Sequence, residues 1–268
     1  MGSPPPRAPA LSTARPGRRP LGSGRVDTHL IARTRPVAAS REQVLPAPAP
    51  LAPLLPGGIR RGSVLLVEGT GGGGGATTLA VSLLATACAA GSWGAVVGLA
   101  DPGVLSIAEL GVDLGRLVLV PRPSAMWPEV TATFLQGMDL VLLRPPGPAR
   151  PDVARRLAAR AREQRTVLVV LTPAGTRWPE GPDLRLGVEA GCWQGVGSGH
   201  GHLRARRVVV TASGRRAAAR EARAEVWLPG PTGAMEAPVP APGEAEERCG
   251  AAVAGGVVPR SRAGRGAR

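Results

Sequence analysis

The chain has 268 residues, 43% of them hydrophobic, which is enough for one domain of ordinary size with flanking segments. Aromatic residues make up only 2%, so we expect a core of Leu, Val and Ala side chains. The net charge of +14 makes attraction to a polyanion such as nucleic acid plausible, but arginine-rich ends would give the same excess without any binding. No run approaches the ~18 apolar residues of a membrane helix, and no apolar signal region follows the amino terminus. We expect a cytoplasmic protein without membrane contact.

Both ends of the chain have a biased composition. Residues 1–50 are rich in Pro, Ala, Arg and Ser, and residues 230–268 return to Pro, Ala, Gly, Glu and finally Arg. Such segments bury too little apolar surface to offset the entropy lost on ordering. We therefore predict a disordered arm over 1–50, a folded domain over 51–229 and a disordered tail over 230–268.

Within the predicted domain, short apolar runs alternate with segments of helical composition. The pattern predicts buried strands at 64–67, 94–100, 116–120, 139–143 and 166–171, and helices at 77–90, 127–137 and 152–164. This alternation is typical of an α/β fold with a mostly parallel central sheet and helices on both faces. Beyond Pro173 we expect longer strands at 184–194 and 203–211 and another at 224–228, which we interpret as antiparallel edge strands near the carboxyl terminus.

The most informative stretch joins the first predicted strand to the first predicted helix. A strand, a glycine loop and a helix start form the arrangement in which a P-loop cradles phosphate. The working pattern G-x-x-x-x-G-K-[ST] is not met, because Ala76 stands at the lysine position and Thr70 where the first glycine belongs. What remains of the pattern is the glycine loop and the two hydroxyl residues after Ala76. We therefore predict a vestigial nucleotide-binding site formed by Gly71, Gly72, Gly73, Gly74, Gly75, Thr77 and Thr78.

The acidic element of a P-loop ATPase is altered as well. The strand at 139–143 would end in an Asp that helps to hold magnesium, and here Arg144 follows, which repels a metal ion. We expect no ATP turnover. A helix N-terminus still attracts an anion by about 0.3–1 kcal/mol in exposed settings. Weak binding of ATP or phosphate thus stays open, beside the alternative that the glycines merely connect strand and helix.

No other motif predicts a catalytic or metal site. The histidines at 200 and 202 near Cys192 fit loop positions, and Asp101 and Glu109 fit loop and helix-surface roles. We interpret Trp178, Trp193 and Trp227 as core or interface anchors. The arginines of the helix at 152–164 most simply solvate its outer face, and contact of arginine-rich segments with DNA is the alternative. These arginines are Arg155, Arg156, Arg160 and Arg162.

The order of the pieces resembles the RecA ATPase core. The resemblance rests on the turn at 55–62 before the first strand, on the loop end Gly75-Ala76-Thr77-Thr78-Leu79, on 110–114 before a strand and on the late run 206–210. It covers residues 51–229 and implies a RecA-like P-loop fold. The nucleotide-binding residues of such a core carry over only at Gly75, Thr77 and Thr78, whereas the lysine and the strand-end Asp do not.

The departures from that core resemble one branch of it. A lysine-free loop, Arg144 at the strand end and no large carboxy-terminal DNA-binding domain look like the ImuA family of mutasome accessory proteins. The resemblance implies a non-catalytic role in SOS-induced translesion DNA synthesis, as a partner of ImuB and through it of an error-prone polymerase. It also implies that the late strands and the tail are partner surfaces. Two alternatives remain: an ATP-dependent RecA-type recombinase or other P-loop ATPase, and a ParA-like or septum-associated regulator.

Overall fold

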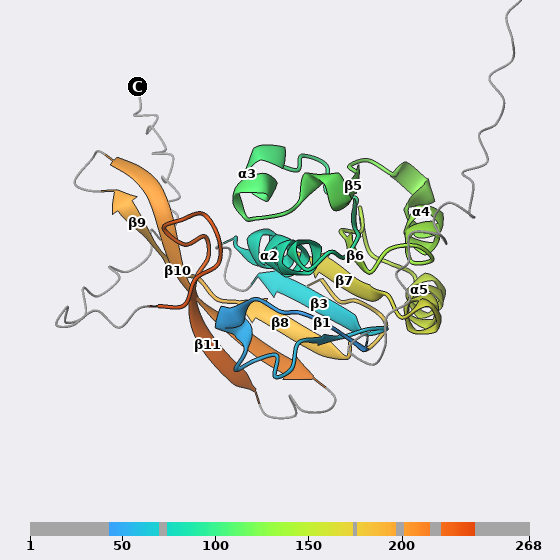
Figure 1. Ribbon diagram of the computed structural model, residues 1–268. Helices are drawn as coiled ribbons and strands as arrows, with labels where there is room; N and C mark the ends of the chain where they lie inside the picture. Colours follow the sequence, from blue (N-terminus) through green and yellow to red (C-terminus); the bar gives the residue numbers. More distant parts are fainter. Residues whose placement is uncertain (1–42, 70–73, 174–175, 197–200, 215–220, 239–268) are drawn as a thin grey trace, which may run out of the picture. The chain divides into compact units, whose positions relative to one another are not determined.

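A computed structural model describes residues 43–69, 74–173, 176–196, 201–214 and 221–238 (Figure 1). These residues contain a nine-stranded sheet of order β11-β10-β8-β3-β7-β6-β4-β5, with β9 paired to β10 beside this path. Its strands are β3 (Val64–Gly69), β4 (Gly94–Val97), β5 (Leu117–Val120), β6 (Leu140–Leu143), β7 (Val167–Thr172), β8 (Leu184–Val188), β9 (Cys192–Val196), β10 (Gly201–Gly214) and β11 (Ala222–Trp227). The helices are α2 (Ala76–Ala89), α3 (Val104–Glu109), α4 (Trp127–Phe134) and α5 (Pro151–Gln164), with short 3-10 turns at Ala49–Leu51, Leu114–Arg116 and Ser124–Met126. None of the helices in the described part of the chain is long and apolar enough to cross a membrane.

The sheet is mostly parallel. The strands from β8 through β3, β7, β6 and β4 to β5 pair in parallel. At one side β10 pairs antiparallel with β8, and both β9 and β11 pair antiparallel with β10. The predicted α/β class, with antiparallel edge strands near the carboxyl terminus, is confirmed.

Helices cover both faces of the parallel strands. On β3, Leu65 and Val67 belong to the core cluster that contains α2, whereas Val64 and Leu66 belong to the cluster that contains α5. Successive strand residues point to opposite faces, so a strand buried on both sides must be apolar at every position. The uninterrupted apolar runs in the sequence are thereby explained.

The segment predicted as one antiparallel strand at 184–194 is two strands. β8 lies inside the sheet, parallel to β3 on one side and antiparallel to β10 on the other, whereas β9 pairs only with β10, in the antiparallel direction. After β7 the chain returns to the edge of the sheet at which the parallel strands begin, and β8 starts there. At this edge the Asp183 carboxylate accepts a hydrogen bond from the backbone N–H of Val64 at 2.9 Å. The break between the strands includes Gly191, where an added methyl group would overlap the carbonyl oxygen of Arg207. The prediction was wrong because an apolar run does not encode strand direction.

Packed structure extends beyond residues 51–229 at both ends. Strand β1 (Val44–Leu45) pairs antiparallel with β2 (Ile59–Arg60), and Leu45 is only 1% exposed. Near the other end Trp227 forms a bridge with Glu236. The segment is held by the β1–β2 pairing and by the buried Leu45, which composition averaged over 50 residues does not reveal. The rest of the predicted arm and tail lies outside the described residues.

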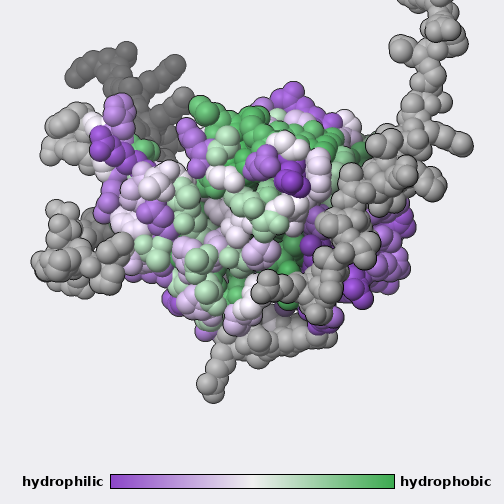
Figure 2. Space-filling model, viewed as in Figure 1, coloured by the Kyte–Doolittle hydropathy of each residue, from purple (hydrophilic) through white to green (hydrophobic). Residues whose placement is uncertain are grey.

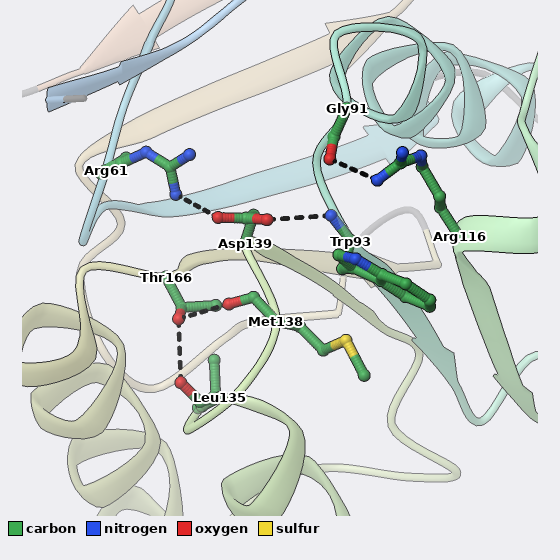
Figure 3. Close-up of polar contacts among 8 residues, drawn as sticks. All are labelled: Arg61, Gly91, Trp93, Arg116, Leu135, Met138, Asp139 and Thr166. Carbon is green, nitrogen blue, oxygen red and sulfur yellow. Dashed lines mark hydrogen bonds and ion pairs between the residues drawn. The ribbon is translucent and has the colours of Figure 1, made fainter. Parts of the chain in front are cut away.

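Asp139, just before β6, connects three segments at the amino-terminal edge of the parallel strands (Figure 3). Its carboxylate accepts Nη1 of Arg61 at 2.6 Å and the backbone N–H of Trp93 at 2.9 Å. Close by, the Thr166 hydroxyl lies 2.8 Å from the carbonyl oxygens of both Leu135 and Met138. These contacts fix the strand starts, so the loops at the opposite edge rise from a rigid base.

Candidate functional site

The glycine loop leaves the carboxyl end of β3 and enters the amino terminus of α2, as the sequence predicts. Gly74 (φ 58°) and Gly75 (φ 102°) both have left-handed backbone conformations, which glycine adopts without strain. Gly75 is the N-cap of α2, and Thr77 and Thr78 follow in its first turn. Gly71, Gly72 and Gly73 lie outside the described residues. The two described loop residues therefore have the backbone conformations that a tight turn into a helix requires.

Ala76 occupies the position of the loop lysine and belongs to the core. It is 9% exposed and packs in the same cluster as the rest of α2. In a working loop the lysine at this place reaches the phosphates and neutralises the developing charge. A methyl group supplies neither contact, so the charge for any bound phosphate must come from another element.

The carboxylates near this edge are already paired. Glu68 is the next-to-last residue of β3. Its two carboxylate oxygens accept hydrogen bonds from Nη1 of Arg185, Oε1 at 2.8 Å and Oε2 at 3.0 Å. Asp101 pairs with Arg122 at 3.3 Å. Arg144 is exposed directly after β6, where a magnesium-holding Asp would stand. Within the described ranges no group of three His, Cys, Asp or Glu side chains is placed to hold a metal ion.

Arg206, on β10, is the residue at this site that the sequence analysis missed. Its side chain is 5% exposed, and its Nη1 would lie 3.1 Å from a methyl group added at Gly75 and 3.7 Å from one added at Gly74. The guanidinium carbon lies 5.6 Å from the ring centroid of Trp193 on β9. Nε has no hydrogen-bond partner, and burial lowers the pKa of the guanidinium below its usual value.

A signal for Arg206 exists in the sequence. Val208 and Val210 follow it at strand spacing, and both are buried on the same face of β10. An arginine in register with buried valines is a buried charge, which requires a partner or a function. What the sequence cannot give is the neighbour, because Gly75 and Arg206 meet only through the sheet order.

The other candidates differ in how deeply they are buried. Trp178 is 4% exposed and packs in the cluster with α5, which confirms it as a core anchor, whereas Trp193 is 45% exposed and Trp227 is half-buried. On α5, Arg155, Arg156 and Arg162 are exposed, and Arg160 is half-buried. Two of these arginines pair with glutamates at 3.8 Å. The outer face of α5 is thus solvated and partly neutralised.

One family model and one relative match this chain in sequence. Residues 53–180 match the family model of the MT3502 N-terminal domain. An uncharacterized protein of Mycobacterium tuberculosis, Rv3395c, is 38% identical over 138 residues, which is 51% of this chain and 66% of that relative. The match thus spans just under two thirds of the relative's length, and its name carries no activity.

Solved structures match over most of the chain. A KaiC-like protein from the hyperthermophilic archaeon Pyrococcus horikoshii OT3 aligns with a TM-score of 0.51 and 16% identity, covering 72% of this chain and 96% of that one. The RadB recombinase aligns with a TM-score of 0.53 and 17% identity, covering 71% and 97%. At these identities the likeness establishes the fold alone. The chain has a RecA-like fold.

Proposed function

We propose that this chain is a non-catalytic RecA-like accessory protein in SOS-induced mutagenic translesion DNA synthesis, acting through contacts with an ImuB-like protein. The observation that carries the proposal is the pair Ala76 and Arg144 on a RecA-like fold. In phosphoryl transfer a lysine at the first position neutralises developing charge, and an Asp at the second helps to hold magnesium. The resemblance to the ImuA family supplies the cellular role.

Exposed apolar surface supports a role in protein contacts. Figure 2 shows apolar surface at the top of the view, where Figure 1 places α3. Val104 (45% exposed) and Leu105 (74%) lie on α3, and Leu114 (43%) lies in the 3-10 turn that follows it. On the late strands, Leu203 on β10 is 57% exposed and Trp193 on β9 is 45% exposed. Apolar patches on a surface mark places where another protein can dock.

Turnover is tested with the full chain. We expect no ATP hydrolysis above background with or without single-stranded DNA. Ala76→Lys alone should not create hydrolysis, because Arg144 still occupies the strand end and repels magnesium. A hydrolysis rate in the native chain that disappears on substituting Thr77 would contradict the proposal. Nucleotide-dependent filaments on single-stranded DNA would instead support the recombinase alternative.

The partner is tested by co-purification with an ImuB-like protein from the same organism and by damage-induced mutagenesis after gene deletion. Leu105→Glu and Leu203→Glu each place a charge at an exposed apolar residue, and Asp152→Ala changes an exposed side chain at the start of α5, a different element. We expect at least one glutamate variant to lose the partner by tenfold or more, and Asp152→Ala to keep it. Absence of any association, together with unchanged mutagenesis in the deletion strain, defeats the proposal.

A further inference from the structure

The amino terminus of α2 carries an uncompensated positive potential. The first backbone N–H groups of a helix have no partner within it, and the aligned peptide dipoles place about half a positive charge there. The N-cap Gly75 offers no side-chain cap, and no acidic residue lies in the first turn. This 14-residue helix therefore presents free donors at the loop.

A second positive charge faces the same point. Arg206 is 5% exposed, and its Nη1 approaches the Gly74–Gly75 turn so closely that a methyl group at Gly75 would lie 3.1 Å from it. No carboxylate among the described residues forms an ion pair with Arg206, and its Nε is buried without a hydrogen-bond partner. A buried guanidinium beside a helix N-terminus is unfavourable on its own, since both are positive and the guanidinium is largely withdrawn from water.

The fold holds Arg206 in this place from three sides. Its backbone N–H donates to the Pro229 carbonyl at 2.9 Å, and its carbonyl accepts the Leu228 N–H at 2.6 Å. The Trp193 ring lies against the guanidinium at 5.6 Å. The side chain is therefore positioned before any ligand arrives, which lowers the entropy cost of binding.

We propose that Arg206 replaces the missing loop lysine, and that it forms with the amino terminus of α2 a binding site for a terminal phosphate group. An anion there would receive the helix N–H groups on one side and the guanidinium on the other. The ligand is either a nucleotide or free phosphate or pyrophosphate. The site should bind without turnover, because Arg144 stands where a magnesium-holding Asp would and because Glu68 and Asp101 are already paired with arginines. It does not depend on the partner proposed above.

The test is calorimetric titration of the full chain with ATP, with pyrophosphate and with inorganic phosphate, in the absence of magnesium. Arg206→Met keeps the length of the side chain and removes its charge, and Arg204→Met is the matched control because Arg204 is exposed on the same strand. We expect saturable binding by the native chain, at least tenfold weaker binding by Arg206→Met and unchanged binding by Arg204→Met. Tighter binding of ATP than of pyrophosphate identifies a nucleotide site, and equal affinities identify a phosphate site.

Thermal melting keeps the test decisive if a variant folds poorly. Because Arg206 is an unpaired buried charge, Arg206→Met should melt no lower than the native chain without ligand, but should lose the upward shift that phosphate gives the native chain. Arg206→Lys should keep part of that shift. The proposal is overturned if the native chain binds none of the three ligands at millimolar concentration, or if Arg206→Met binds as tightly as the native chain.

Discussion

Asp139→Ala should destabilise the domain by about 2.5 kcal/mol. The substitution removes the partner of Arg61, at 2.6 Å, and the acceptor of the Trp93 N–H, at 2.9 Å. The side chains of Arg61 and Asp139 are 18% and 22% exposed, so water partly screens the pair and we assign it about 1 kcal/mol. The Trp93 N–H loses a charged acceptor, which costs about 1.5 kcal/mol. Asp139→Asn keeps one acceptor oxygen and should cost about 1 kcal/mol.

Urea denaturation followed by circular dichroism measures these differences, with the slope of the transition required to stay constant. In thermal melting, about 2.5 kcal/mol corresponds to a fall of about 5–10 °C. Asp101→Ala is the control, because the Asp101 carboxylate is 89% exposed in its pair with Arg122 and should contribute less than about 0.5 kcal/mol. A double-mutant cycle with Arg61→Met should give a coupling of about 1 kcal/mol. The reasoning fails if Asp139→Ala lies within about 0.5 kcal/mol of the native chain.

Three further predictions concern packing, backbone conformation and pH. Leu45→Ala should lower the free energy of unfolding, measured by urea denaturation, by about 2–5 kcal/mol. Val44→Ala, at a residue 39% exposed, should lower it by less than about 1 kcal/mol. Equally small losses for both variants would show that β1 does not pack into the core. Gly98→Ala should cost about 1–3 kcal/mol in the same assay, because Gly98 has φ 82° and a methyl group would overlap the Arg144 carbonyl; a neutral effect contradicts this geometry. Burial, reinforced by Asp113, raises the pKa of Cys88 from 9.0 to about 11, so at pH 8 its alkylation, followed by peptide mass spectrometry, should be about 100-fold slower in the folded chain than in urea. Since the folded pKa is the higher one, the thiol's contribution to stability is complete below pH 9 and is lost as pH rises through about 11; alkylation equally fast in both states would refute the shift.

The parallel half of the sheet follows from the sequence because its strands are buried on both faces. Runs such as Val64–Val67 and Leu140–Leu143 are apolar at every position, and glycine or proline punctuates the helices between them. The helix at 76–89 differs from its prediction by one residue at each end. What could not be predicted depends on pairing between distant segments: the direction of β8, the docking of β1 on β2, and the short helix α3, whose six residues give too little periodicity.

The candidate site divides in the same way. Gly75, Ala76, Thr77 and Arg144 are legible because each stands at a fixed offset from a recognisable strand or helix. Arg206 has no such offset, since β10 reaches the loop only by antiparallel pairing with β8, which itself lies beside β3. The local motif therefore shows that the loop has no lysine, and only the sheet order shows that Arg206 lies beside the loop.

Phosphate binding and phosphate hydrolysis require different residues, and we propose that this chain keeps the first set without the second. Binding needs backbone donors and a positive charge, which in our proposal come from the amino terminus of α2 and from Arg206. Hydrolysis needs, in addition, a metal ion and a group that orients water, and Arg144 at the end of β6 opposes the metal. A nucleotide held at this loop would consequently leave by dissociation and not by turnover. The occupied fraction of the loop would then depend only on the nucleotide concentration. A partner bound to the late strands would therefore contact a loop at binding equilibrium, without the alternation of states that hydrolysis drives.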